Sequence, residues 1–197
     1  MTMVDALDDL RAPLAQWLGE RLGVEVVQVA GVSRPGGGQS NDTILFEAEW
    51  RERGLGRREA LVLRREQTGH HIFRAPDVVR EFRVLSGLAS SWVPVPRVRW
   101  AEADPVVLGA PFFVMHAVPG HVPLARPSIH SHGWLPSLTT SEREHLWSSA
   151  LDALVAIHAV DWAASHSFLL DGDPATAGVA HHLDRIADWY RWAAAGR

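Results

Sequence analysis

Three consecutive glycines, Gly36 to Gly38, interrupt a part of the chain that otherwise has the composition of β-strands. The valine-rich residues 25–32 precede the glycines, and apolar and polar side chains alternate in residues 43–50 after them. Both patterns predict strands. Glycines weaken the interior of a strand because they have no side chain to pack. The sequence therefore predicts two antiparallel strands joined by a glycine loop.

Two interpretations of this loop stay open from the residues alone. The first is a flexible hairpin, since glycine is common in turns. The second is a phosphate-binding loop, because amides without a neighbouring Cβ approach a phosphate closely, and Gln39, Ser40 and Asn41 could donate to its oxygens. No Gly-Lys-Ser/Thr follows and the next element is a predicted strand, which excludes a Walker motif and a Rossmann fingerprint.

The remaining periodicity predicts further helices and strands. Pro76 and Asp77 suit a first helical turn, and Ser141 with Glu144 has the spacing of a capping box. Predicted helices cover residues 5–22, 76–88, 141–158 and 181–195, and predicted strands cover 25–32, 43–50, 60–65, 97–101 and 111–118. Five strands with one inserted helix, followed by helices, indicate an α+β fold built on a five-stranded antiparallel sheet.

A change in composition divides the chain. Proline, histidine, glycine and serine dominate residues 119–136, which is typical of a linker. We predict that this linker separates two subdomains.

Composition excludes several kinds of chemistry. The 197 residues contain no cysteine, and all 19 basic residues are arginine, so disulfides, thiolate zinc sites and lysine Schiff bases are excluded. A net charge of −4 gives no reason to expect a nucleic-acid partner. The N-terminus lacks a hydrophobic signal core, and the apolar run near residues 112–115 is too short to span a bilayer. We therefore expect a soluble, cytoplasmic protein without a membrane partner.

Six segments carry a family resemblance through their order and spacing. They are GGGQSNDTILF (36–46), LVLRRE (61–66), VVREFRVLSGL (78–88), VPVPRV (93–98), GAPFFVMHAVPG (109–120) and AIHAVDW (156–162). Together they resemble the aminoglycoside phosphotransferase and choline-kinase-like family, which has a protein-kinase-like fold. They are especially similar to the branch that resembles the kinase-like domain fused to some acyl-CoA dehydrogenases. The resemblance implies a kinase-like N-terminal lobe over residues 1–118, a linker or hinge segment over 119–140, and the incomplete start of a helical C-terminal lobe over 141–197.

The resemblance also implies an ATP site. Arg64 takes the position of the phosphate-binding lysine of kinases, Val62 lies on the same strand face and contacts the base, and Glu81 anchors Arg64. The strand that runs into Pro119-Gly120 corresponds to the hinge whose backbone binds adenine. The implied nucleotide-binding residues are Gly36, Gly37, Gly38, Gln39, Ser40, Asn41, Val62, Arg64, Glu81, Met115, His116 and Val118.

The catalytic residues of the family have no match. The family pattern is His-Gly-Asp with an Asn five residues after the Asp, then an Ile-Asp-Trp-like metal segment. Trp134 stands where His132-Gly133 would need Asp, and Asp171-Gly172-Asp173 has Asp in place of His. Asp161 belongs to a segment already matched. We therefore expect an ATP-dependent phosphotransferase with a small-molecule hydroxyl acceptor, lacking here its catalytic Asp and magnesium ligands. The alternative is a catalytically inactive nucleotide-binding or protein-association module.

The remaining histidines, arginines and tryptophans are predicted to have structural roles. We predict solvated histidines rather than a metal site at His70-His71, His130, His132 and His181-His182, because no third ligand has a recognisable spacing. The arginines of residues 51–58 are predicted to form a solvated turn. Trp17 and Trp147 are predicted core residues. Trp189 and Trp192, in the final helix, are expected to be exposed if the second lobe is incomplete, and could mediate self-association.

Overall fold

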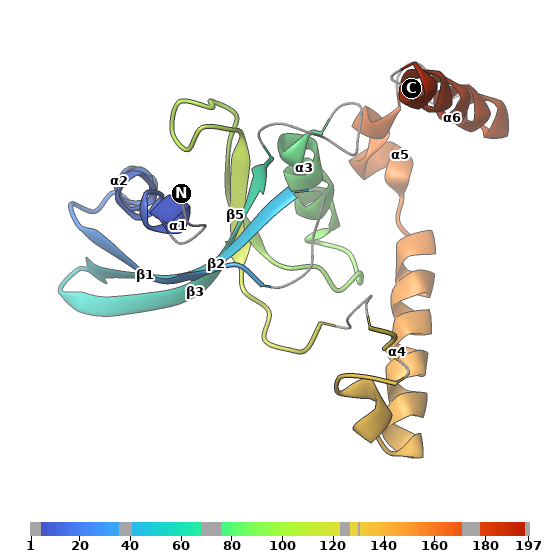
Figure 1. Ribbon diagram of the computed structural model, residues 1–197, viewed down its shortest axis with the longest axis horizontal. Helices are drawn as coiled ribbons and strands as arrows, with labels where there is room; N and C mark the ends of the chain where they lie inside the picture. The colour runs from blue at the N-terminus through green and yellow to red at the C-terminus, as the bar shows by residue number, and fades with distance from the viewer. Residues whose placement is uncertain are drawn as a thin grey trace.

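The computed structural model describes residues 5–35, 41–67, 76–122, 127–129, 131–170 and 178–195. Figure 1 shows the order of the elements along the chain. The helices are α1 (Asp5–Asp8), α2 (Arg11–Leu22), α3 (Val78–Leu88), α4 (Thr140–His158), α5 (Trp162–Ser165) and α6 (Val179–Ala194). The strands are β1 (Val27–Ser33), β2 (Asn41–Glu52), β3 (Leu55–Glu66), β4 (Val98–Glu102) and β5 (Phe112–His116), and two 3₁₀ turns are η1 (Leu135–Ser137) and η2 (Ser167–Leu169).

The five strands form one antiparallel sheet in the order β1-β2-β3-β5-β4, which confirms the predicted α+β fold. Strands β2 and β3 form a long hairpin, paired from Asn41 with Glu66 to Glu52 with Leu55. Positive φ angles of 50° at Arg53 and 83° at Gly54 are those of a two-residue primed turn. The hairpin extends beyond the predicted strands. Its charged end lacks the alternation of apolar and polar residues from which strands were predicted, so the prediction stopped short of the turn. Residues 51–58 are exposed there, as predicted for the arginine cluster.

Helix α2 covers one face of the sheet and forms the main core (Figure 1). Leu14 and Leu18 of α2 are buried with Leu61 and Leu63 of β3, and Trp17 packs against the ring of Phe112 at a centroid distance of 4.8 Å. The prediction that Trp17 belongs to the core is confirmed.

The single helix predicted over residues 5–22 is wrong, because the structure has two helices, α1 and α2, separated at Asp9 and Leu10. Pro13 explains the break. Its ring would clash with the carbonyl of Asp9 in a continuous helix, and it has no N–H to donate to that carbonyl.

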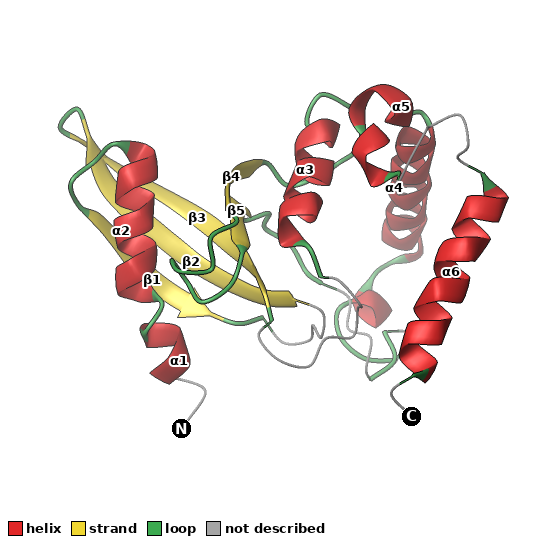
Figure 2. Cartoon of the chain, turned by 90° about the horizontal axis from the view of Figure 1, so that it is seen from above, coloured by secondary structure: helices red, strands yellow, loops and turns green. Residues whose placement is uncertain are grey.

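Helix α3 covers the opposite face of the sheet and lies against β3, β4 and β5 (Figure 2). It begins at Val78, two residues after the predicted start, because Asp77 is the N-cap and not part of the first turn: its carboxylate accepts a hydrogen bond of 2.7 Å from the amide of Arg80. Val78 is buried, and the rings of Phe82 and Phe113 lie 6.0 Å apart. The sheet is therefore enclosed by one helix on each face.

Helices α4 and α6 have no buried residues. Trp147 is 68% exposed, so its predicted place in the core is wrong: α4 packs no buried side chain against the described sheet. Trp189 and Trp192 are 48% and 39% exposed, as expected. Among the described helices, none is both long enough and apolar enough to cross a bilayer.

The start of α4 differs from the prediction by two residues. Thr139, rather than Ser141, is the N-cap, and Glu142 rather than Glu144 completes the capping box. The carboxylate of Glu142 accepts a hydrogen bond of 2.7 Å from the Thr139 amide. Ser141 lies inside the first turn, where its side chain cannot cap the helix.

Candidate functional site

Arg64 lies near the end of β3 on the face covered by α3, paired with Thr43 on β2 and Phe113 on β5. Its Nη1 donates a hydrogen bond of 2.9 Å to Thr43 Oγ1. Its Nη2 lies 3.1 Å from one carboxylate oxygen of Glu81 and 3.2 Å from the other. The structure thus brings together Arg64 and Glu81, which are 17 residues apart.

Glu81 also binds Asn41, the first residue of β2. The amide Nδ2 of Asn41 donates to Glu81 Oε2 at 3.2 Å, so a single carboxylate orients both polar side chains. The position of Glu81 depends on the start of α3. That start is tied to β3 because Glu66 Oε1 accepts a hydrogen bond of 3.1 Å from the Val78 amide.

Two buried polar atoms of this cluster lack a partner among the described residues: the Nε–H of Arg64 and the Oδ1 of Asn41. A buried donor or acceptor without a partner costs about 1–3 kcal/mol, so native structures rarely leave one without a reason. Arg65 Nε in the neighbouring strand-end cluster also lacks a described partner, so the feature that suits a polar ligand is the combination of one donor and one acceptor at Arg64 and Asn41. Gly36, Gly37, Gly38, Gln39 and Ser40 lie outside the described residues, and their phosphate-binding role stays a prediction.

A second ionic cluster lies beside the first, on the α2 face of the same strand ends. Asp42 accepts hydrogen bonds from Arg34 at 2.7 and 2.8 Å and from Arg65 at 2.8 Å, and Arg65 also donates to the carbonyl of Leu108 at 2.9 Å. Burial raises the pKa of Asp42, but the hydrogen bonds and charges of the two arginines outweigh it and hold the pKa below its ordinary value of 3.8. The cluster fixes the ends of β2 and β3.

This pKa shift predicts an acid-sensitive contribution to stability. The contribution is fully present above the ordinary pKa of 3.8 and is lost as pH falls through the lower folded-state pKa. We expect Asp42→Asn to lower the free energy of unfolding by about 1–3 kcal/mol at pH 7 and by less at pH 3. Urea unfolding at both pH values measures this, with the exposed Asp152→Asn as control. Equal losses for Asp42→Asn at the two pH values would contradict the prediction.

In β5 and the residues after it, where the adenine-binding hinge is predicted, two of the backbone amides already donate hydrogen bonds within the protein. Val62 and Met115 pair across β3 and β5, on the face that carries Arg64. The amide of His116 donates to Arg97 at 2.9 Å, and that of Ala117 donates to Ala60 at 2.9 Å. Both amides are therefore occupied. Val118 follows the last of these pairings and is 68% exposed. Its backbone amide is therefore the one to which the hinge prediction now applies.

The side chain of His116 lies on the other face of the sheet from Arg64. Its Nε2 is 3.4 Å from Nη1 of Arg99, and its Nδ1 is 4.0 Å from the carboxylate of Glu59. Arg99 in turn donates to Glu59 at 2.9 Å. The imidazole therefore belongs to an ionic cluster between β3, β4 and β5, and only the backbone of His116 can serve the predicted site.

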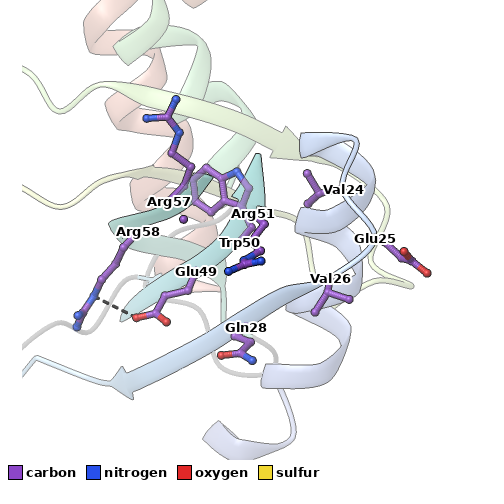
Figure 3. Close-up of a pocket in the computed structure, with 10 residues that line it drawn as sticks. Val24, Glu25, Val26, Gln28, Glu49, Trp50, Arg51, Arg57 and Arg58 are labelled. Atoms are coloured by element: carbon purple, nitrogen blue, oxygen red, sulfur yellow. Dashed lines mark ion pairs between the residues drawn. The ribbon is translucent and has the colours of Figure 1, made fainter. Parts of the chain in front are cut away.

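A cavity of about 780 Å³ lies at the opposite end of the sheet, around the β2–β3 turn (Figure 3). Its lining includes Trp50, Arg51 and Arg58, and Arg58 forms an ion pair of 3.3 Å with Glu49. Arg58 precedes Arg64 by six residues on β3, a separation of about 20 Å in an extended strand. The cavity is therefore distinct from the Arg64–Glu81 cluster, and its arginines are largely paired with neighbouring carboxylates.

Sequence patterns missed part of the site. Thr43 could have been found from the hairpin register, because it is paired with Arg64. No sequence motif predicts the Asp42 cluster. Among the described residues, no group of three or more His, Asp or Glu side chains could hold a metal ion. His70, His71 and His130 lie outside the described residues.

The five-stranded sheet with its helices agrees with the comparisons to known proteins. The model of the phosphotransferase enzyme family matches residues 31–196, so the chain belongs to that family. A crystal structure from Ralstonia eutropha JMP134, of a protein that its name places provisionally among the aminoglycoside phosphotransferases, superposes with a TM-score of 0.53 and 25% identity. The match covers 78% of this chain and 39% of that one. The protein-kinase-like fold expected from the sequence is confirmed.

The curated relatives are long proteins of which this chain spans a small part. Mouse acyl-CoA dehydrogenase family member 10 is 34% identical over 69% of this chain and 12% of its own length. The probable acyl-CoA dehydrogenase IBR3 of Arabidopsis thaliana is 33% identical over 66% of this chain and 15% of its own length. Human acyl-CoA dehydrogenase family member 11 is 26% identical over 77% of this chain and 17% of its own length. The resemblance to the branch fused to acyl-CoA dehydrogenases is therefore confirmed.

Proposed function

We propose that these residues form the ATP-binding part of a cytoplasmic phosphotransferase that acts on a hydroxyl group of a small molecule. The observation that carries the proposal is a pair of buried atoms without a described partner, Arg64 Nε and Asn41 Oδ1, in two residues that both bind Glu81. Arg64 supplies a donor to a phosphate oxygen, while Glu81 and Thr43 hold its other nitrogens in place. The proposed lobe, linker and second lobe are residues 1–118, 119–140 and 141–197.

The proposed nucleotide lies between the strand end and the hinge. Residues 36–41 cover its phosphates, the apolar side chains of Val62 and Met115 contact the base, and the Val118 backbone binds its polar edge. This arrangement is supported by the register that pairs Val62 with Met115, two residues from the pairing of Arg64 with Phe113 on the same face. An adenine thus has an apolar platform next to a cationic group, as ATP recognition requires.

Magnesium, which the family implies, does not fit the described residues. They hold no group of three or more carboxylate or imidazole side chains that could bind it, and Asp161 is occupied as the N-cap of α5, accepting from the amide of Ala164 at 3.2 Å. The His132-Gly133-Trp134 segment does not supply the catalytic Asp, because it precedes α4 and the indole of Trp134 cannot accept a proton from a substrate hydroxyl. The described residues therefore supply neither a magnesium site nor the catalytic Asp of the family pattern.

This proposal predicts nucleotide binding without appreciable turnover. We expect the 197-residue chain to bind ATP in a saturable calorimetric titration, and to form no phosphorylated product with ATP, Mg²⁺ and a panel of hydroxylated acceptors, because general-base catalysis alone contributes about 10²–10⁴-fold to rate. Absence of ATP binding would contradict the proposed function. Rapid turnover would contradict the prediction that these 197 residues lack the catalytic Asp and the magnesium ligands.

Self-association is a second candidate function, and the apolar surface of α6 favours it. Leu183, Ile186, Trp189 and Tyr190 are between 47% and 71% exposed. Exposed apolar patches of this kind are typical of interaction surfaces. The same sample distinguishes the two candidates, since an association module without a nucleotide site would give a dimer in sedimentation and no heat of ATP binding.

A further inference from the structure

Helix α3, which carries Glu81, contacts the sheet on one side and a segment near the C-terminus on the other. The segment is Ser165 to Leu169, formed by the end of α5 and η2, and Figures 1 and 2 both show α5 beside α3. Nothing in the sequence motifs or in the proposed ATP site accounts for this contact. It joins residues more than 80 positions apart.

His166 is the centre of the contact. It is 4% exposed, and it is the one buried polar or charged residue among the described residues. Its Nε2 lies 3.0 Å from the carbonyl oxygen of Val84 in α3, and its Nδ1 lies 2.6 Å from Ser165 Oγ. Because a carbonyl can only accept, Nε2 carries the hydrogen. Both ring nitrogens are thus used, and the imidazole is fixed against the helix.

Two arginines of α3 extend the contact along the same helix face. Arg80 donates from Nη2 to the carbonyl of Leu169 at 2.8 Å. The guanidinium of Arg83 lies over the ring of Phe168, 3.9 Å from its centroid, which is a cation–π distance. Positions 80, 83, 84 and 87 share one face of a helix, whereas Glu81 and Phe82 are directed toward the sheet side. The segment Ser165 to Leu169 therefore packs against the face of α3 that is turned away from the sheet.

Gly87 allows His166 to approach. A Cβ at this position would lie 2.9 Å from His166 Nε2, 3.0 Å from its Cε1 and 3.3 Å from the carbonyl oxygen of Ser165. Those distances are too short for an unchanged structure. Glycine in the last turn of α3 lowers its helix propensity by about 1 kcal/mol relative to alanine. The close contact with His166 gives a physical reason for glycine here.

We propose that His166 is a positioning residue that clamps α3, through Val84 and Gly87, so that Glu81 meets Arg64. The clamp acts on the ion pair indirectly, since His166 contacts neither Glu81 nor Arg64 among the described residues. Its effect on nucleotide affinity rests on the proposed function, but its effect on the Arg64–Glu81 pair does not. A clamp from this segment couples the helical part of the chain to the cluster at the sheet.

The test monitors the side chain of Arg64 directly. The Arg64 Nε–Hε resonance, assigned by its loss in Arg64→Ala, is recorded in the full 197-residue chain without nucleotide. We expect His166→Ala to move this resonance toward its position in Glu81→Ala, and to speed amide hydrogen exchange in residues 82–88 at least tenfold. His166→Gln, which keeps a donor for Val84, should restore much of the wild-type spectrum, and His166→Phe should not. The exposed His182→Ala is the matched control.

Gly87→Ala separates the clamp from general helix stability. Alanine strengthens α3 as an isolated helix but displaces His166, so the proposal requires the Arg64 resonance to move as in His166→Ala. An unchanged resonance in both His166→Ala and Gly87→Ala would overturn the clamp.

Measurements of nucleotide affinity provide an independent test of the clamp. We expect His166→Ala to weaken ATP binding about three- to tenfold in the wild-type background and not at all in Glu81→Ala, since the clamp acts through that carboxylate. The same loss in both backgrounds would overturn coupling through Glu81. If wild-type protein binds no ATP, the proposed function fails, and the resonance and exchange results alone decide the clamp.

Discussion

Replacing Arg64 with alanine is expected to weaken ATP binding by about 10- to 100-fold. A hydrogen bond to a charged group contributes about 1.5–3 kcal/mol, and each 1.4 kcal/mol is a factor of ten in the dissociation constant. The substitution also leaves Glu81 without its cation, so a carboxylate would face the phosphates. Calorimetric titration of wild-type and Arg64→Ala protein measures the difference.

Arg58→Ala is the matched control for this experiment. Arg58 lies on the same strand and the same face as Arg64, but its partners are Glu47 and Glu49 beside the distant cavity. We expect its removal to change the ATP dissociation constant less than twofold. If both variants bind ATP as the wild type does, Arg64 has no place in the nucleotide site. If Arg58→Ala has the larger effect, the cavity in Figure 3 is the binding site instead.

The largest effect on stability is expected at Phe112. This side chain is fully buried between the sheet and α2, where its ring contacts that of Trp17. Truncation of a buried phenylalanine to alanine costs about 3–5 kcal/mol, through the lost apolar burial and the cavity that remains. We expect Phe112→Ala to lower the free energy of unfolding by this amount in urea titrations monitored by circular dichroism.

Trp92→Ala provides the comparison for Phe112. Trp92 is also a large aromatic residue, but it is 95% exposed, so its loss should change stability by less than about 0.5 kcal/mol. A similar loss at both positions would mean that the α2–sheet interface is not the core of the protein. A Phe112→Ala chain that is already unfolded without urea agrees with the prediction, provided that Trp92→Ala remains folded.

The sheet was predictable because its central strands follow simple alternation. In β2, Ile44, Phe46, Ala48 and Trp50 are buried while the residues between them are not, which is the pattern that the sequence displays. The glycine-centred segment and the six ordered motifs then indicated the family. Strand ends were less predictable, because Arg57 and Glu52 extend the hairpin through an ion pair of 3.1 Å rather than through apolar burial.

The helical part was harder to predict from local patterns. Trp147 lies in an apolar helix, and such a helix predicts a core, but burial depends on which elements pack against it. The contact between Gly87 and His166 is equally invisible to periodicity, since a single glycine and a single histidine distant in sequence have no motif. The pairing of Arg64 with Glu81 was accessible only through the family resemblance, which supplied the long-range correspondence.

The position of bound ATP tests the proposed nucleotide site most directly, and chemical-shift changes of backbone amides and of the Arg64 Nε–Hε group during titration map that position. Saturable shifts are expected at Asn41, Val62, Arg64 and Val118, with no shift at Arg58. A titration that leaves all of these resonances unchanged, or that shifts only the residues around Arg58, would contradict a nucleotide site at the Arg64–Glu81 pair.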